Sequence, residues 1–336
     1  MRRLEITVGG AGILGLWQAL TLAGAGHHVR LVDASHEPFA ASASRYAGAM
    51  LAPECEAEAA PVVVRDMGRL AQARWRAVYP HLVERGTLVV AAARDRPELI
   101  RFARLTEAHE LRDANGIADL EAALGGRFAS GLYFASEAHM SAPDALAFLL
   151  DQVRAAGVDV AFGTAIPEAL KPGTILVDCR GLAARHHLPG LRGVRGERLV
   201  VRAPDVGLTR PVRLLHPRHP LYVVPWLDSH YMIGATVIES EDTGSASVRS
   251  ALELLGAAYA LHPAFGEAEI IEIGAGVRPA FADNVPRVVV RDGGGHIFVN
   301  GAYRHGFLLA PVLADAVAQM LSGDPQLHPL VVTRGG

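Results

Sequence analysis

The sequence predicts an α/β protein of two interleaved lobes, one built on a parallel sheet and one on an antiparallel sheet. Three observations lead to this prediction. The 336 residues exceed the size at which a single core usually stops growing. Strand and helix patterns alternate near both ends of the chain. Between them, short apolar runs separated by turn residues are typical of an antiparallel sheet.

An apolar run near the start of the chain leads directly into Gly10, Gly12 and Gly15, which have the spacing GxGxxG. Gly10 permits a tight turn, Gly12 lets the backbone approach a pyrophosphate, and Gly15 lets the following helix pack close to the strand. The helix N-terminus would then bind a phosphate. A second apolar run ends at Asp33, whose carboxylate would accept hydrogen bonds from a ribose 2′-hydroxyl. This order of features predicts a site for NAD or FAD rather than NADP.

The uncharged stretch 7–26 also admits another interpretation, because it follows two arginines and resembles a signal peptide or a membrane span. Six glycines within it argue against both. Its large apolar residues fall at helical spacing and form one stripe: Ile13, Leu16, Trp17 and Leu20. A single stripe is typical of a helix packed on a sheet, so we favour a strand, turn and helix here.

Composition favours a small-molecule ligand. The formal net charge is −3 with acids and bases interspersed, which excludes the charge pattern of a nucleic-acid or membrane-surface binder. Cys55 and Cys179 have no metal-binding or CxxC spacing, which favours a reducing cytoplasm. The fifteen histidines include no HExxH motif and no companion cysteine cluster, so we expect no metal site.

Apolar periodicity and turn residues predict the elements that follow the first unit. A polar loop occupies residues 41–49 and an acidic run residues 54–58. Helices are expected at residues 65–79, 97–108 and 145–156, the last starting near Ser141. Strands are expected at residues 86–93, 131–134, 158–162 and 174–177. The last two strands alternate with helices and are predicted to join the first sheet as parallel strands.

The pattern changes at residue 195. Short strands are expected at residues 198–201, 222–224, 231–233 and 269–273, with a helix at 247–260. A final strand at 297–299 and a helix at 307–321 form a last βα unit. The buried stripe of that helix consists of Leu309, Leu313, Val317 and Met320. The chain therefore leaves the first lobe, forms an antiparallel sheet, and returns.

Two places carry residue types suited to chemistry. The glycine-bearing turn 299–306 would let backbone approach a planar ligand, and the following helix dipole would stabilise negative charge on a reduced flavin. Arg278 lies at the junction of the lobes, where its guanidinium could bind a carboxylate bidentately. Tyr222 could donate its hydroxyl to the same carboxylate. No GxSxG motif is present and no proton-transfer residue, His305 included, stands out, a pattern that suits hydride transfer.

Four stretches together carry a family resemblance. They are residues 10–15 with Asp33, residues 47–53, residues 276–279 and residues 301–311. With these motifs the chain resembles the D-amino acid oxidase superfamily of flavoproteins, and within it the glycine oxidases of thiamine biosynthesis. The resemblance implies a Rossmann-like FAD-binding domain interleaved with an antiparallel-sheet α+β substrate domain. It assigns residues 1–80, 139–193 and 277–336 to the FAD-binding domain, and residues 81–138 and 194–276 to the substrate-binding domain.

The resemblance also implies roles for particular residues. Arg278, Tyr222 and Arg304 are expected to bind and orient the substrate carboxylate, and the loop 42–50 is expected to wrap the isoalloxazine. Non-covalent FAD is expected to contact the following residues: Gly10, Ala11, Gly12, Ile13, Leu14, Gly15, Asp33, Ala34, Ser42, Ala47, Gly48, Ala49, Met50, Gly181, Gly301, Tyr303, Arg304, His305, Gly306, Phe307 and Leu308.

The activity implied is oxidative deamination of glycine or another small amino acid. A hydride passes from the substrate α-carbon to flavin N5, and dioxygen is reduced to hydrogen peroxide. The imine is hydrolysed to glyoxylate or enters thiazole synthesis. The resemblance also implies a cytoplasmic homo-oligomer that binds neither nucleic acid nor membrane.

Three alternatives stay open on the sequence. The substrate can be a D-amino acid or sarcosine, oxidised by an oxidase or a dehydrogenase of the same superfamily. An NAD-dependent dehydrogenase shares the first glycine motif, and so does a protein that senses the nucleotide without turnover. Asp33 stands where the superfamily usually has glutamate, and Cys179-Arg180 precedes Gly181 where members often have small residues.

Overall fold

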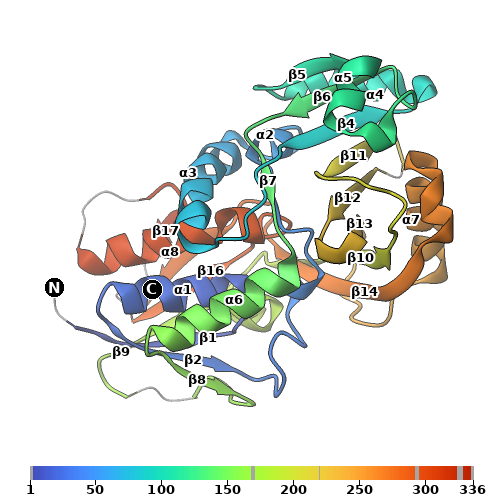
Figure 1. Ribbon diagram of the computed structural model, residues 1–336. Coiled ribbons are helices and arrows are strands. Elements are labelled where there is room, and N and C mark those ends of the chain that lie inside the picture. Colours follow the sequence, from blue (N-terminus) through green and yellow to red (C-terminus); the bar gives the residue numbers. More distant parts are fainter. Residues whose placement is uncertain (1–2, 168–170, 219, 292–294, 324–327, 334–336) are drawn as a thin grey trace.

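The computed structural model describes residues 3–167, 171–218, 220–291, 295–323 and 328–333. Figure 1 shows two lobes, one around β1 (Glu5–Gly9) and the other around the long strands β10 (Arg192–Arg202) and β14 (Glu269–Ala280). One lobe has a largely parallel sheet and the other a largely antiparallel sheet. The predicted α/β fold class is therefore confirmed.

The first lobe contains a seven-stranded sheet in the order β17-β15-β16-β9-β1-β2-β8 among the described residues. Its other strands are β2 (His28–Asp33), β8 (Asp159–Phe162), β9 (Thr174–Asp178), β15 (Arg287–Arg291), β16 (His296–Asn300) and β17 (Val331–Thr333). Only β15 and β16 pair antiparallel. The strands β8 and β9 flank β2 and β1 in parallel, as the alternating pattern predicts. The turns that follow β1, β2 and β9 consequently open at one edge of the sheet.

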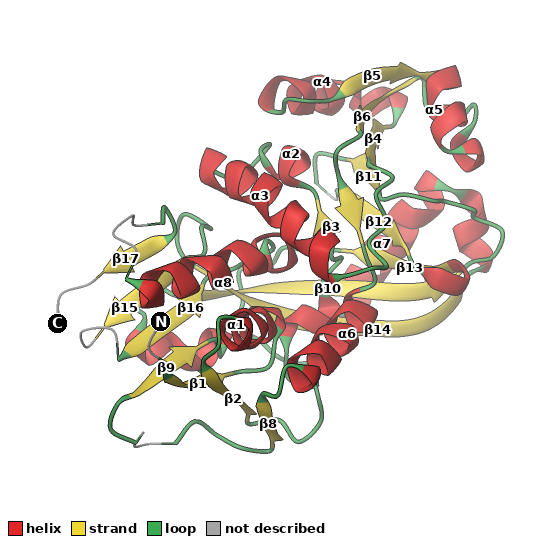
Figure 2. Cartoon of the chain, turned by 60° about the vertical axis from the view of Figure 1, so that its left-hand side comes forward, coloured by secondary structure: helices red, strands yellow, loops and turns green. Residues whose placement is uncertain are grey.

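Four long helices of this lobe are α1 (Ile13–Gly24), α3 (Val62–Val78), α6 (Ala142–Ala155) and α8 (Gly306–Ser322). Figure 2 shows α1 between α6 and α8, and α8 also packs on α3. Trp75 of α3 contacts both α1 and α8. Its ring centroid lies 5.0 Å from that of Trp17, which it meets edge-on, and 6.1 Å from that of Phe307, with which it stacks. Its Nε1 donates to the Phe307 carbonyl oxygen at 2.8 Å, so the start of α8 is fixed next to α1.

The second lobe contains an eight-stranded sheet in the order β14-β10-β13-β12-β11-β4-β6-β5 within the described part of the chain. Its other strands are β4 (Thr87–Ala91), β5 (Glu110–Asp113), β6 (Ser130–Phe134), β11 (Val212–Leu215), β12 (Leu221–Pro225) and β13 (His230–Gly234). All neighbours pair antiparallel except β11 and β4. The helix α7 (Val248–Leu261) packs on one face through Leu254 and Ala258. The opposite face of the sheet is contacted by the loop after β2, which belongs to the first lobe.

The remaining elements are short. The helices α4 (Arg96–Leu105) and α5 (Ala114–Leu120) lie against the far strands of the second sheet, and β3 (Met50–Leu51) pairs with β7 (Ala138–His139) beside α2 (Pro53–Glu56). No helix in the described ranges combines the length and the apolar character needed to cross a membrane.

The expected strands at 198–201 and 269–273 are wrong in length. Both belong to the ribbon of β10 and β14, which pair at eleven positions. Glycines and a proline weaken a strand, and no apolar alternation marks the outer parts of either one. In this ribbon Gly196 lies opposite Gly276, and the long backbone ladder outweighs their low strand propensity. Arg278 therefore lies within β14 rather than after it.

Candidate active site

The glycines after β1 form a tight turn into α1. Gly10 has φ +94° and donates its N–H to the Val32 carbonyl oxygen at 2.8 Å. A Cβ on Gly15 would collide with the carbonyl oxygen of Gly10, and one on Gly12 would lie 2.9 Å from Ser42 Oγ. Each glycine is thus needed for close approach, at Gly15 between helix and turn and at Gly12 between helix and the following loop.

Asp33 ends β2 beside this turn. Its Oδ2 accepts the Ala11 N–H at 2.7 Å and its Oδ1 accepts the Ser35 N–H at 2.8 Å. Each carboxylate oxygen has a second lone pair, so these bonds orient Asp33 without using all of its acceptor capacity. Ala34 follows at an exposed position. The shorter aspartate is therefore held against the glycine turn, at the edge where the ribose is expected.

The C-terminal turn lies against the same helix start. A Cβ on Gly306, the first residue of α8, would be 3.4 Å from Ile13 Cγ2, so the N-termini of α1 and α8 meet. Buried Asn300 fixes the turn: its Nδ2 donates to the Gly181 carbonyl oxygen at 2.9 Å, and its Oδ1 accepts the Gly301 N–H at 2.8 Å. The predicted residues Gly181 and Gly301, both with positive φ, are thus brought together beside the first glycine motif.

The same turn also contacts the second lobe. Tyr303, which has φ +48°, donates its N–H to the Pro279 carbonyl oxygen at 2.8 Å, and Ala302 bridges to Ala280. Arg278 immediately precedes these residues on β14. The turn therefore links the cofactor side of the fold to the strand that carries the expected carboxylate anchor.

Strand register places Arg278 and Tyr222 on one face of the antiparallel sheet. Residues directly opposite each other in an antiparallel pair share a face. Arg278 lies two positions from Gly276, which is opposite Gly196. Tyr222 is opposite Gly234, which is opposite Arg198 on the same strand as Gly196. The face between the two predicted residues therefore contains three glycines, Gly196, Gly234 and Gly276, together with buried Arg198.

The loop after β2 covers this face. A Cβ on Gly48 would lie 2.9 Å from the Tyr222 ring, so the loop rests directly on the tyrosine. Next along the loop, the Ala49 carbonyl oxygen accepts the Met140 N–H at 3.2 Å, and Met50 pairs with His139 as adjacent strands. The predicted loop and the predicted substrate tyrosine are thus in contact, between the two lobes.

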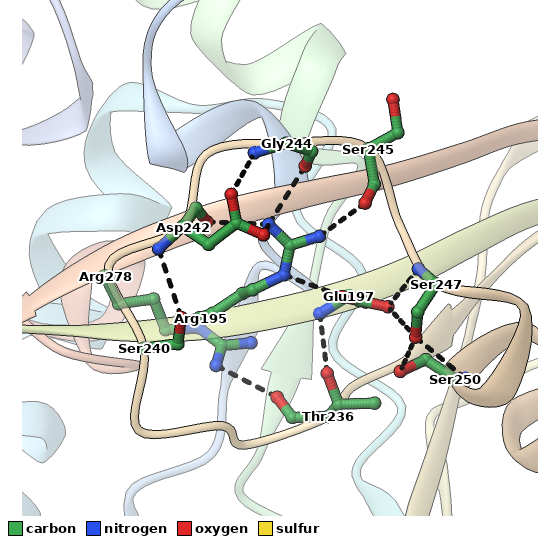
Figure 3. Close-up of polar contacts among 10 residues, drawn as sticks. All are labelled: Arg195, Glu197, Thr236, Ser240, Asp242, Gly244, Ser245, Ser247, Ser250 and Arg278. Atoms are coloured by element: carbon green, nitrogen blue, oxygen red, sulfur yellow. Dashed lines mark hydrogen bonds and ion pairs between the residues drawn. The ribbon is translucent and has the colours of Figure 1, made fainter.

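The Arg278 side chain extends over Gly196, where a Cβ would collide with its guanidinium. Its Nη1 donates to the Thr236 carbonyl oxygen at 3.2 Å, as Figure 3 shows. Thr236 is itself fixed by Glu197. The Thr236 N–H donates to the Glu197 carbonyl oxygen at 3.1 Å, and the Glu197 N–H donates to Thr236 Oγ1 at 2.9 Å. One edge of the guanidinium is therefore held by backbone.

Behind the sheet, buried Arg195 stabilises the loop that carries this contact (Figure 3). Its Nε donates to Glu197 Oε1 at 2.7 Å. Three of its other N–H groups donate to backbone carbonyl oxygens of the loop, those of Asp242, Gly244 and Ser245. The other Glu197 oxygen accepts the Ser247 N–H at 2.9 Å, where α7 begins. Because its charge is paired and four of its five N–H groups donate hydrogen bonds, Arg195 acts as a clamp for this loop.

Arg304 is paired with Glu56 rather than pointing freely into the site. Its Nε donates to Glu56 Oε2 at 2.6 Å, and the other Glu56 oxygen accepts from Arg213 Nη2 at 2.9 Å. Burial by itself raises the pKa of Glu56, but the two guanidinium groups outweigh it and hold that pKa well below its usual range. Glu56 is thus ionised and fixes the side chain of Arg304, which belongs to the C-terminal turn.

Comparisons with known proteins agree with this arrangement. The sequence profile of the FAD dependent oxidoreductase (DAO) family matches residues 5–320. The chain belongs to this family. A proposed thiamine biosynthesis oxidoreductase, ThiO, of Rhizobium etli is 49% identical over 327 residues, which cover 96% of this chain and 99% of that protein. The resemblance to amino acid-oxidising flavoproteins is confirmed at the level of the family.

Solved structures share the fold of this FAD-dependent oxidoreductase. Glycine oxidase of Bacillus cereus superposes with a TM-score of 0.84 at 20% identity, over 98% of this chain and 97% of its own. Glycine oxidase of Geobacillus kaustophilus has a TM-score of 0.82 at 23% identity, over 99% of both chains. At these identities the likeness shows the fold.

The residues present fit the FAD of this family. Two helix N-termini meet at Ile13 and Gly306, where their dipoles favour anionic groups. Four of the expected contact residues have side chains in the core, which leaves these side chains unavailable to the cofactor: Ile13, Leu14, Phe307 and Leu308. The Ile13 N–H donates to Ser44 Oγ at 3.1 Å, so the loop after β2 lies against this helix start. The other expected positions, from Ser42 to Met50 and from Gly301 to His305, belong to two segments of the first lobe that lie beside this point.

Glu137 is a buried carboxyl close to Arg213. Its Oε1 accepts the Cys55 N–H at 2.7 Å, while its Oε2 has no hydrogen-bond partner among the described residues. Burial raises the pKa of Glu137 from 4.5 to about 7, although nearby Arg213 opposes the shift. The neutral acid is therefore the form that folding favours.

This raised pKa predicts a specific pH dependence of stability. The stabilisation from protonated Glu137 is complete below pH 4.5 and is lost as pH rises through 7, by about 3 kcal/mol. Glu137→Gln mimics the neutral acid. We expect its urea unfolding midpoint to match wild type at pH 5 and to exceed it at pH 8. Glu110→Gln, at an exposed carboxyl, should track wild type at both values. A Glu137→Gln midpoint that also tracks wild type at both would contradict the assignment.

Sequence reasoning missed three residues that shape this site. Glu56 lies in the acidic run 54–58, which looks like a solvated surface, yet it is only 7% exposed. Arg213 is on β11, a strand that the sequence pattern did not reveal, and its partner is 157 residues away. Thr236 contributes a carbonyl oxygen, which no side-chain motif can indicate. Within the described ranges no group of three or more His, Cys, Asp and Glu residues is arranged to hold a metal ion.

Proposed function

We propose that this protein catalyses the FAD-dependent oxidative deamination of glycine or another small amino acid, in the synthesis of the thiamine thiazole. The observation that carries the proposal is the shared sheet face: Arg278 and Tyr222 lie on the same glycine-containing face, and the loop expected to contact the flavin rests on Tyr222. The 49% identity to a ThiO over nearly the whole chain supports the thiamine assignment.

The chain's own residues would bind and orient the substrate. Thr236 holds one edge of Arg278, which leaves the rest of the guanidinium free to bind a carboxylate through paired hydrogen bonds. Tyr222 adds a hydroxyl on the same sheet face. When bound, FAD supplies the two-electron acceptor for the substrate Cα hydride, and dioxygen takes up these electrons as hydrogen peroxide. The glycine imine then reacts with water to give glyoxylate and ammonia.

The proposed role of the protein is mainly positional. Fixing the carboxylate defines where Cα lies, and orientation of this kind contributes much of the rate in hydride transfer. Glu56 is paired with Arg304 and Arg213, which holds the Arg304 side chain in place. The proposed chemistry needs no covalent step on the protein.

A peroxide-coupled assay tests the proposal. Purified protein saturated with FAD is offered glycine, sarcosine, D-alanine and a set of L-amino acids. We expect peroxide from glycine or another small member, with one glyoxylate formed per peroxide for glycine. A preference for sarcosine or D-alanine would assign the related oxidase activity instead. Bound FAD with no peroxide and no flavin reduction by any of these compounds would reject the proposal.

A further inference from the structure

The ring of Tyr46 lies on bare backbone of β14. A Cβ on Gly276 would be 2.9 Å from Tyr46 Cδ2, and one on Gly274 would collide with the same ring. Gly274, Gly276 and Arg278 alternate along the strand and share one face. Tyr46 therefore occupies the sheet face immediately beside the proposed carboxylate anchor.

Two arginines fix the ring. The guanidinium carbons of Arg45 and Arg198 lie 5.1 and 5.3 Å from its centroid. Arg198, only 2% exposed, also donates from Nη2 to the Arg45 carbonyl oxygen at 3.2 Å and to Glu272 Oε2 at 3.0 Å. These contacts join Tyr46 and its loop to both β10 and β14. The ring is consequently a rigid wall rather than a mobile side chain.

The position of the Tyr46 ring limits the space on this sheet face beside Arg278. The Arg278 guanidinium lies over Gly196, which is directly opposite Gly276. Opposite positions in an antiparallel pair are roughly 5 Å apart, so the ring over Gly276 stands beside the guanidinium itself. A carboxylate bound by Arg278 therefore places the substrate Cα next to the Tyr46 ring. Tyr46 as a whole residue is half-buried. The glycines at 274 and 276 are needed to seat the ring.

We propose that Tyr46 sets substrate size, by closing the space that a side chain larger than methyl would occupy. This inference rests on the proposed function and adds to it the residue that restricts the enzyme to small amino acids. It also explains why the motif around Arg278 begins with glycine.

Substitution of the ring tests this directly. In Tyr46→Ala we expect the ratio of kcat/KM for D-valine to that for glycine to rise at least about tenfold, the scale on which one or two methylenes are discriminated in a pocket. Tyr46→Phe keeps the ring and should keep the wild-type ratio. Tyr259→Ala removes an exposed tyrosine from α7 and serves as the matched control, with no change expected. An unchanged ratio in Tyr46→Ala with FAD still bound would overturn the inference.

A second measurement needs neither a variant nor turnover. Unreactive carboxylates of increasing size, from acetate to isovalerate, are titrated into wild-type protein while the flavin spectrum is followed. We expect the dissociation constant to rise at least about tenfold with the branched acid. Equal affinities would overturn the inference even if Tyr46→Ala failed to fold. If no amino acid is oxidised, the proposed function fails, while these affinities still report on the size of the pocket.

Discussion

Gly15→Ala is expected to yield a protein that does not retain FAD. The new Cβ would collide with the carbonyl oxygen of Gly10, and that backbone atom cannot rotate away as a side chain would. The helix must therefore move from the turn, and the N–H groups at its start move with it. We expect FAD affinity to fall at least about 100-fold, or about 3 kcal/mol. Titration of apoprotein with FAD, followed by quenching of flavin fluorescence, measures this loss.

Gly24→Ala is the matched control for this prediction. Gly24 lies at the other end of α1, and a Cβ there would meet no atom within 4 Å. Alanine should leave FAD affinity unchanged and stabilise the helix by up to about 1 kcal/mol. If Gly15→Ala bound FAD as tightly as Gly24→Ala, the glycine turn would not be the cofactor site.

Arg278→Ala should abolish tight binding of the substrate while FAD remains bound. Arg278 is positioned by Thr236 on the sheet face, away from the glycine turn after β1. Loss of a charge-assisted pair with a carboxylate costs about 3–4 kcal/mol, so we expect kcat/KM for glycine to fall about 100- to 1,000-fold, mostly through KM. The visible flavin spectrum should be unchanged. Steady-state kinetics with the FAD-loaded variant checks both expectations.

Two further variants sharpen this test. Arg278→Lys keeps the charge but loses the planar fork, and should recover only part of the affinity. Arg202→Ala removes a half-exposed arginine from β10 and should behave as wild type, since it lies far along the sheet from Thr236. An Arg278→Ala enzyme with wild-type KM for glycine would place the carboxylate anchor elsewhere.

Much of the nucleotide-binding lobe could be predicted because its signals are local. The glycine spacing, the apolar runs and Asp33 lie within 33 residues, and each constrains backbone in a way that few residue types allow. The turn before α8 was predicted for the same reason. The structure places Gly306 against Ile13, so two segments nearly 300 residues apart meet where the cofactor is expected.

The second lobe was harder to predict because its strands depend on pairing with distant residues. β5 (Glu110–Asp113) is an exposed, charged edge strand without apolar alternation, and the sequence pattern does not reveal it. The length of β14 depends on its ladder with β10, not on its own composition. The partners of Arg304 could not be predicted either, since an acidic run shows nothing about burial. The domain boundaries and the roles of the site residues stay predictions.

The central claim is that two glycine-bearing segments hold one FAD above a sheet face where Arg278 anchors a small amino acid. Anaerobic mixing tests it most directly. Purified FAD-loaded protein is combined with glycine in the absence of oxygen, and the main visible flavin band is followed in time. We predict complete bleaching with glycine or another small amino acid, and return of the band when air is admitted. A band that persists with glycine, sarcosine and D-alanine alike would contradict the account.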